Sequence, residues 1–189
     1  MRIIVAITGA SGVVYGKRLL EVLKGKSEVH LIISKASDTL IEYELETTKK
    51  QLEELANHVY DEDDFSSPLA SGSFVTDAMI IIPCSMKTLA GIAHGYSENL
   101  ILRAADVILK EKRKLILVPR ETPLNPIHLR NLLKLSLQGV MIIPAMPAFY
   151  HKPKTIEDLV DFIIGKVLDS LGIDHELFKR WTGFSSVLS

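Results

Sequence analysis

The chain has few of the residues that stabilise secreted or metal-bound proteins. Its single cysteine, Cys84, excludes an internal disulfide framework and a zinc site built from several cysteines, so a reducing compartment is the simpler inference. The formal net charge of −1 gives no support for binding to nucleic acid or to a membrane surface. No apolar run approaches the roughly 20 residues of a membrane-spanning helix, and the first residues lack the regions of a signal peptide. We therefore expect a cytoplasmic protein.

The length and composition are those of an ordinary globular protein. Hydrophobic residues make up 47% of the 189 residues and charged residues 24%, which predicts a single domain over residues 1–189. The tail after Leu171 (about 172–189) contains Trp181 and Phe184 among polar residues. We expect this tail to pack on a neighbouring subunit, with fraying as the alternative.

Short apolar runs alternate with helical patterns along the chain. The runs are rich in Ile and Val and mostly continuous, which is typical of strands covered on both faces. They span residues 3–7, 29–33, 78–82, 115–118 and 140–143. The helical patterns span residues 13–23, 35–46, 49–58, 87–94, 99–112, 127–137 and 156–171, the last with Thr155 as its expected N-cap. This alternation predicts an α/β, doubly wound, Rossmann/flavodoxin-like three-layer fold with a mainly parallel sheet, which binds ligands at the carboxyl ends of its strands.

A turn of small residues, Thr8-Gly9-Ala10-Ser11-Gly12, joins the first strand to the first helix. Free N–H groups and the positive end of the helix dipole meet there, which predicts an anion site, although an ordinary tight turn has the same character. The glycine spacing differs from the dinucleotide motif G-x-G-x-x-G. The second strand ends in Ser34-Lys35, where an NAD site needs an acid. A mononucleotide such as FMN therefore fits better than NAD.

The third apolar run is followed by Ser85-Met86-Lys87-Thr88. Two hydroxyls and an ammonium at the start of a helix suit a phosphate or the polar edge of a flavin ring, although Ser is also an ordinary N-cap. The preceding Cys84 is better interpreted as a small buried side chain than as a nucleophile, because no histidine lies near it in sequence.

Charged residues near the strand ends are candidates for catalysis. Arg120-Glu121 follows the fourth run, where Arg120 could grip a phosphate and Glu121, if buried, could move protons; a surface pair is the alternative. Arg103 and Lys110 lie seven residues apart and share one helix face, with a solvated face as the simpler interpretation. Glu44 is a second candidate carboxylate, although its pattern alone is that of an exposed helix residue.

Two segments and the histidines indicate no chemistry of their own. The acidic residues 61–64 are expected to form a solvated loop, and residues 66–73, rich in Ser, Pro and Gly, a second loop. The histidines show no metal-ligand spacing, so no metal is inferred. They are His30, His58, His94, His128, His151 and His175.

Taken together, these stretches resemble the flavin prenyltransferases, the UbiX-type family. The matching motifs follow one another with similar spacing over nearly the whole chain. They are residues 8–12 with 15–16, 33–36, 70–73, 83–85, 99–100 with 103–107, 118–121, 128–129, 149–151 and 157–162.

The resemblance implies a homo-oligomer, usually a homo-dodecamer, with active sites at subunit junctions. The enzyme would join a dimethylallyl group from dimethylallyl phosphate to N5 and C6 of reduced FMN, without a metal. The product, prenylated FMN, would serve a UbiD-type decarboxylase.

The resemblance also assigns roles by position. The residues implied to hold FMN are Gly9, Ala10, Ser11, Ser34, Ser85, Met86, Lys87, Thr88 and Arg120. Those implied to surround the prenyl phosphate are Lys110, Arg120, Tyr150, Lys166 and Trp181. Those implied to act in catalysis are Ser11, Glu44 and Glu121, which would handle protons, with Arg103 nearby.

Two departures and two alternatives accompany this interpretation. The family often has Arg where this chain has Lys166, and Ser-Thr-Gly-Thr at residues 85–88. Both departures affect which prenyl donor the enzyme would prefer, and the sequence does not decide between a monophosphate and a diphosphate donor.

Two alternative functions remain: an FMN-binding carrier without transferase activity and a flavin-dependent cysteine decarboxylase. The latter is expected to carry Pro-Ala-Ser-Ala-Asn-Thr where residues 83–88 stand here.

Overall fold

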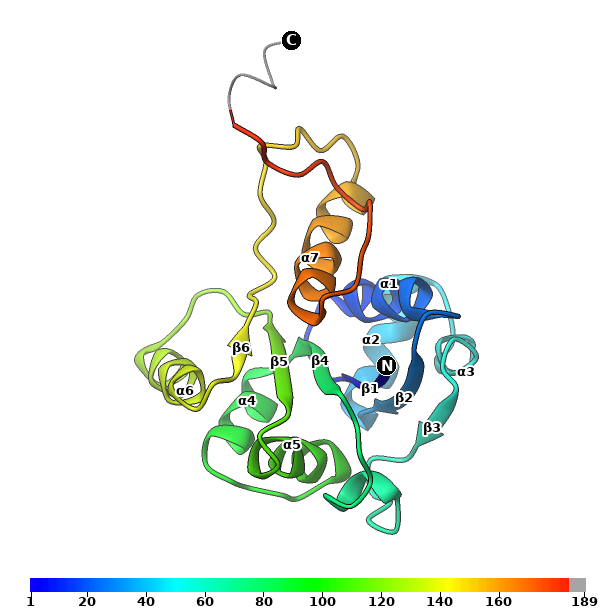
Figure 1. Cartoon of the computed structure of the whole chain (residues 1–189), viewed down its shortest axis with the longest axis vertical. Helices are drawn as coiled ribbons and strands as arrows, with labels where there is room; N and C mark the ends of the chain where they lie inside the picture. Colours follow the sequence, from blue (N-terminus) through cyan, green and yellow to red (C-terminus); the bar gives the residue numbers. More distant parts are fainter. Residues whose placement is uncertain (184–189) are drawn as a thin grey trace. The chain divides into compact units, whose positions relative to one another are not determined.

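The computed structural model describes residues 1–183 and divides into two compact units, Met1–Ala145 and Met146–Ser189. Residues 184–189, which include Phe184 of the expected tail, lie outside the described part. The first unit contains the sheet and the helices around it, and the second contains one long helix with the segments that flank it (Figure 1).

A six-stranded sheet with the order β3-β2-β1-β4-β5-β6 forms the centre of the first unit, and every neighbouring pair is parallel. The strands are β1 (Arg2–Ile7), β2 (Glu28–Ile33), β3 (His58–Tyr60), β4 (Ala78–Cys84), β5 (Lys114–Pro119) and β6 (Met141–Ile142). In the central strands β1 and β4 only Arg2 is not fully buried. This burial on both faces explains their continuous apolar sequence.

The helices of the first unit lie on both faces of the sheet. They are α1 (Val13–Leu23), α2 (Lys35–Leu45), α3 (Lys49–Glu53), α4 (Met86–Ala93), α5 (Leu100–Lys110) and α6 (Pro126–Leu137), with a 3-10 helix η1 (Pro68–Ala70). The chain moves from β1 to β2 in one direction across the sheet and from β4 to β5 in the other. Right-handed crossovers therefore place α1 on one face and α4 with α5 on the other, as Figure 1 shows. The strand order thus reverses between β1 and β4, where ligands bind in such sheets.

The structure confirms the predicted fold class and the position of each predicted strand, and it adds β3. The predicted helix over residues 49–58 ends at Glu53, and His58–Tyr60 instead pairs with β2. This edge strand has only three residues and no apolar run. It forms because it pairs with β2, which lies about 30 residues away in sequence, and a local sequence pattern cannot reveal such pairing.

The acidic segment after β3 is more than the solvated loop that was expected. The Glu62 carboxylate accepts hydrogen bonds from the N–H of Lys35 (2.7 Å) and from Nδ2 of Asn99 (2.8 Å). Its backbone oxygen accepts the N–H of Leu100 (2.7 Å). Glu62 therefore joins the start of α2 to the start of α5. Its three partners, Lys35, Asn99 and Leu100, are all far from it in sequence.

The second unit is built around α7 (Ile156–Leu171), whose predicted N-cap is confirmed. The Thr155 hydroxyl accepts the N–H of Asp158 at 3.2 Å. The Asp158 carboxylate accepts in return from the N–H groups of Lys154 (2.7 Å) and Thr155 (3.1 Å), which hold the pKa of Asp158 below its usual value. The helix ends at Gly172, whose φ of 73° is left-handed. Among the described residues, no helix is both long and apolar enough to span a membrane.

Candidate active site

A pocket of about 610 Å³ lies at the carboxyl ends of the strands, on the side of the sheet where sequence analysis places the ligand. Residues that follow β1, β2, β3, β4 and β5 all contribute to it. It is lined by Gly9, Ser34, Lys35, Ala36, Glu62, Ser85, Met86, Lys87, Thr88, Gly91, Tyr96, Asn99, Ile101, Leu102 and Glu121. The structure therefore gathers seven of the predicted site residues: Gly9, Ser34, Ser85, Met86, Lys87, Thr88 and Glu121.

Thr8, which is buried directly after β1, joins two of the loops that line the pocket. Its hydroxyl donates to the backbone oxygen of Pro83 (2.8 Å) and accepts the N–H of Ser85 (2.8 Å). One side chain thus joins the loop after β1 to the loop after β4. Both loops belong to the point where the strand order reverses, so the hydroxyl holds the two walls of the crevice at a set distance.

Gly9 brings the first turn against the start of α2. A Cβ atom at Gly9 would stand 2.8 Å from the Cβ of Ala36, closer than real side chains approach, and 3.2 Å from the backbone oxygen of Ala36, which is a tight contact. The neighbouring Ser34 begins α2, and its hydroxyl lies 2.8 Å from that of Ser37. The Ser37 hydroxyl in turn donates to the backbone oxygen of Ile7 (3.1 Å). Small and hydroxylated residues therefore allow two segments to meet at this wall.

The loop after β4 supplies the second wall. The Ser85 hydroxyl accepts the N–H of Thr88 (3.2 Å) and lies 3.0 Å from the Thr88 hydroxyl, so Ser85 is the N-cap of α4. Met86 and Lys87 follow and line the pocket. Cys84 is fully buried, and desolvation raises the pKa of its thiol. Because a thiolate is the reactive form, this confirms the interpretation of Cys84 as a buried side chain.

Three predicted residues meet at the start of α1. The Glu44 carboxylate accepts the N–H groups of Gly12 (2.8 Å) and Val13 (3.2 Å). Nε of Arg120 donates to the backbone oxygen of Ser11 at 3.1 Å. Gly12 has a φ of 102°, a backbone conformation that other residues rarely adopt, which explains the glycine at this turn. The start of α1 therefore holds a carboxylate and lies beside a guanidinium.

Arg120 and Glu121 bind different partners instead of each other. Glu121 accepts the N–H of Thr122 (3.1 Å) through one carboxylate oxygen and lines the pocket, whereas Arg120 is directed to the first turn. Glu121 is exposed in this chain, so the burial that would suit it for proton transfer is not provided by the described residues alone.

Arg103 and Lys110 do not line the pocket within the described chain. Nε of Arg103 donates to the backbone oxygen of Ala70 (3.1 Å), and its Nη1 pairs with Asp106 (2.9 Å). Lys110 pairs with Glu111, with Nζ and Oε1 2.6 Å apart. Arg103 thus ties α5 to η1, in the segment that was expected to be a simple loop.

Predicted residue Ala10 is buried in the first turn, where its N–H donates to the backbone oxygen of Thr8 (2.7 Å), and it does not line the pocket. Three other predicted residues belong to the second unit. Nζ of Lys166 lies 3.8 Å from the carboxylate of Asp169. The rings of Tyr150 and Trp181 meet edge to face with 5.5 Å between their centroids, and Tyr150 makes a similar contact with Phe162 at 6.0 Å. Tyr150 and Trp181 therefore form one aromatic cluster.

Several pocket residues were not singled out from the sequence as site residues. They are Lys35, Ala36, Glu62, Gly91, Tyr96, Asn99, Ile101 and Leu102. Lys35, Ala36 and Asn99 lie inside family motifs, which could have indicated them. Glu62 gave only the signal of an acidic run, and the pattern of α5 shows that Ile101 and Leu102 are apolar without showing what they face.

The lining fits a flavin mononucleotide. Ser34, Ser85 and Thr88 offer hydroxyls, Lys87 offers an ammonium, and Met86, Ile101 and Leu102 offer apolar surface for a ring. Pockets that bind small molecules usually have volumes of about 300–1,000 Å³, and their walls are mostly apolar with a few polar groups that orient the ligand. The pocket, about 610 Å³ in volume, has this character.

The parallel sheet and its strand-end pocket define an α/β nucleotide-binding protein, and the model of the Flavoprotein family matches residues 1–168. The chain is 59% identical to flavin prenyltransferase UbiX of Methanocaldococcus jannaschii, over 96% of this chain and 98% of the relative. It is 56% identical to the same enzyme of Methanothermobacter thermautotrophicus, over 96% and 95%. The chain therefore belongs to the flavin prenyltransferase (UbiX) family and is a transferase, as its motifs predict.

Solved structures agree with this assignment. A dodecameric FMN-dependent UbiX-like decarboxylase from Escherichia coli O157:H7 superposes with a TM-score of 0.95 at 49% identity, over 97% of this chain and all of that chain. AnUbiX, solved with FMN and dimethylallyl pyrophosphate, also gives 0.95, at 47% identity over 97% and 98%. The peptidyl-cysteine decarboxylase EpiD gives 0.59 at 21% identity over 78% of this chain and 81% of its own, a likeness of fold alone.

Proposed function

We propose that this chain joins a dimethylallyl group from dimethylallyl phosphate to N5 and C6 of reduced FMN. The observation that carries the proposal is the convergence of five strand ends on one pocket whose lining fits a flavin. The bond to N5 forms as phosphate leaves with the electrons of the allylic C–O bond, and N5 gives up its proton. The bond to C6 forms when the remaining double bond of the prenyl group takes up a proton and C6 gives up its own. The prenylated FMN would then pass to a UbiD-type decarboxylase.

Residues of the chain would act on charge and on protons. Arg120 can neutralise the charge that develops on the leaving phosphate, and it lies beside the positive end of the α1 dipole. Glu121 lines the same pocket and is proposed to accept a proton from the flavin. Ser11 and Glu44 lie at the same turn and are proposed to take part in proton movement.

We propose that neighbouring copies complete the site in a homo-dodecamer. Arg103 and Lys110 lie outside the pocket of their own chain, and Glu121 is exposed there. A relative that assembles as a dodecamer supports this arrangement.

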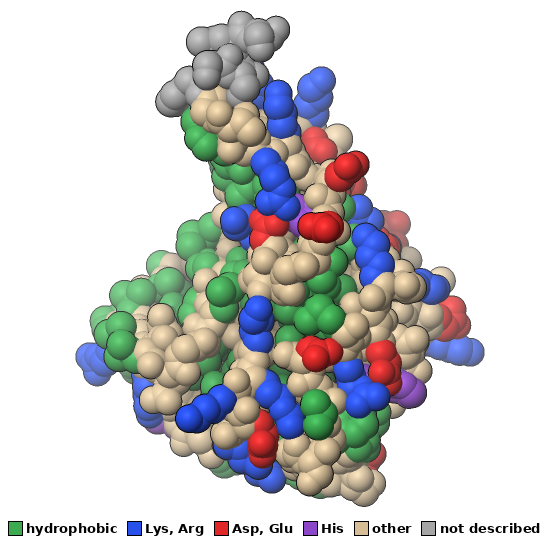
Figure 2. Space-filling view, viewed as in Figure 1, with side chains coloured by type: hydrophobic (Ala, Val, Ile, Leu, Met, Phe, Trp, Pro, Cys, Tyr) green, Lys and Arg blue, Asp and Glu red, His purple; other side chains and the backbone are tan. Residues whose placement is uncertain are grey.

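Helix α6 also presents an apolar face to solvent, with Ile127, Leu133 and Leu137 each at least 60% exposed. Hydrophobic side chains are visible over α6 at the left of Figure 2. Such a face is typical of a surface covered by another subunit.

The deciding experiment combines purified protein, reduced FMN and dimethylallyl phosphate, and analyses the flavin by mass spectrometry. The expected product is a flavin heavier by one prenyl unit. A parallel reaction with the diphosphate establishes which donor is used. Unmodified FMN that stays reduced and bound in both reactions would contradict the proposal and favour the carrier.

A further inference from the structure

A second cluster of ligand-type side chains lies at the amino ends of β2 and β3, at the other edge of the sheet from the flavin pocket. Glu28 and His30 are two residues apart on β2 and therefore point to the same face. His58 begins β3 and is the register partner of His30. The rings of His30 and His58 stack with 4.5 Å between their centroids.

The three side chains converge on one carboxylate oxygen. Oε1 of Glu28 lies 3.2 Å from Nε2 of His30 and 3.3 Å from Nε2 of His58. One ligand atom from each of the three residues lies within 4.8 Å of the others. Two ligands bound at about 2.05 Å to a tetrahedral zinc ion are about 3.3 Å apart. The two carboxylate-to-imidazole separations match this value, and movement of the half-exposed His58 ring would shorten the third, which is at most 4.8 Å.

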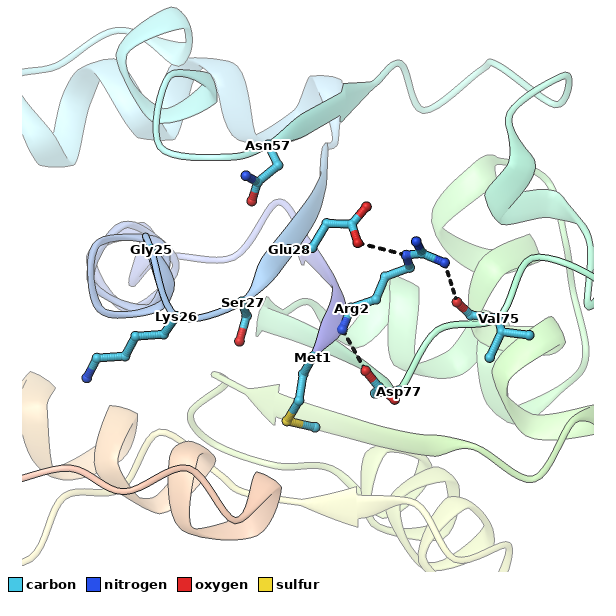
Figure 3. A pocket seen from close by; sticks show the side chains of 9 residues that line it. All are labelled: Met1, Arg2, Gly25, Lys26, Ser27, Glu28, Asn57, Val75 and Asp77. Carbon is cyan, nitrogen blue, oxygen red and sulfur yellow. Dashed lines mark hydrogen bonds and ion pairs between the residues drawn. The ribbon is translucent and has the colours of Figure 1, made fainter.

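In His30 and Glu28 the atom that would not bind the metal is already held by a neighbour. Nδ1 of His30 lies 2.9 Å from the Tyr60 hydroxyl, and Oε2 of Glu28 accepts from Nε of Arg2 at 3.0 Å. Figure 3 shows this Arg2–Glu28 contact, and the same guanidinium donates to the backbone oxygen of Val75. Ligating histidines and carboxylates in metalloproteins have such outer partners, which orient the ligand atoms.

The same surroundings select the kind of ion. The guanidinium of Arg2 opposes a cation that relies on carboxylate charge, as Mg²⁺ and Ca²⁺ do. Two imidazoles with one carboxylate suit a first-row divalent ion, and Zn²⁺ accepts this ligand set with a further position for water. His30 is 2% exposed, and Phe74 lies edge-on to its ring at 5.3 Å, so one side of the cluster is dry.

We propose that Glu28, His30 and His58 bind one Zn²⁺ ion and that this ion fixes the short edge strand β3 to β2. His30 binds through the lone pair of Nε2 while its Nδ1–H donates to the Tyr60 hydroxyl. His58 and Oε1 of Glu28 complete the protein ligands, and solvent takes the open position beside exposed His58. The site is structural, since it lies at the opposite strand ends from the flavin pocket.

Zn²⁺ titration of the chelator-treated, tag-free full chain tests the proposal, with calorimetry for stoichiometry and thermal unfolding for stability. We expect one ion per chain and a rise in Tm. Glu28→Gln and His58→Gln should each weaken binding by more than the roughly tenfold loss expected for Tyr60→Phe, which removes only an outer partner. Retained FMN binding shows that each variant is folded.

His94→Gln is the matched control, because His94 is an exposed histidine at the end of α4. It should bind Zn²⁺ as the unmodified chain does. The proposal is overturned if the unmodified chain binds no Zn²⁺. It is also overturned if the loss in His58→Gln or Glu28→Gln is no larger than in His94→Gln, since scattered surface groups would then account for the binding.

Discussion

The carboxylate of Glu44 accepts a hydrogen bond from the N–H of Gly12 at 2.8 Å, which joins the end of α2 to the start of α1. A second bond comes from the N–H of Val13 at 3.2 Å. These N–H groups lie at the positive end of the α1 dipole, so a carboxylate occupies the position where the turn would hold a phosphate. A phosphate bound at this turn would compete with the Glu44 carboxylate for the same donors.

Glu44→Ala should lower the free energy of unfolding by about 1 kcal/mol, because the first N–H groups of α1 lose their acceptor. It should also tighten the binding of inorganic phosphate, because the same donors become free. Urea unfolding and phosphate titration measure the two effects. Glu42→Ala, an exposed residue on the same helix, is the control. Equal behaviour of the two variants would contradict a capping role for Glu44.

Glu121→Gln should bind reduced FMN as the unmodified chain does but slow prenylation by about 100-fold or more, because an amide cannot accept the proton. Flavin fluorescence measures binding, and the mass of the flavin over time measures the reaction. Glu54→Gln, an exposed residue at the end of α3, should leave both unchanged. A normal rate in Glu121→Gln would remove this carboxylate from the reaction.

Glu62→Ala should lower the free energy of unfolding by about 1–3 kcal/mol, because the N–H of Lys35 and the amide of Asn99 lose their acceptor. It should also weaken FMN binding, since both partners line the pocket. Asp63→Ala is a close control. It breaks only the exposed ion pair with Lys35, and such pairs contribute about 0–1 kcal/mol. An equal loss in both variants would show that charge, and not the joining of α2 to α5, is what matters.

Gly9→Ala should destabilise the chain by about 1–3 kcal/mol and weaken FMN binding, because the new methyl group would stand 2.8 Å from the Cβ of Ala36. Adding Ala36→Gly removes that contact and should recover part of both losses, measured as a double-mutant cycle. Full additivity of the two changes would show that the residues do not press on each other.

The central fold could be predicted because β1, β4 and their neighbours are buried on both faces and therefore read as continuous Ile and Val. The ends of α1 and α7 could be predicted because local sequence features mark them, such as the Thr155 N-cap of α7. Strand β3 was missed, because its three residues are ordered by pairing with His30, Leu31 and Ile32 of β2 and not by a pattern of their own.

The site could be predicted as far as it follows from strand ends. Gly9, Ser34 and Ser85 each follow a strand, and parallel strands open at one edge, so their convergence needs no further information. Glu62 could not be foreseen, since its partners are Lys35 and Asn99, far away in sequence. The pairing of Arg103 with Ala70 depends in the same way on tertiary contacts.

The hydroxyl of Thr8 separates the pocket into a fixed and an adaptable part. It ties the segments after β1 and β4 together, so these two segments cannot separate without losing two hydrogen bonds. Lys87 and Tyr96 also line the pocket, but both are exposed. A change in the size of the accepted ligand would therefore begin at exposed lining residues such as these, whereas a larger side chain at Thr8 would break the two hydrogen bonds that join the loops of the pocket.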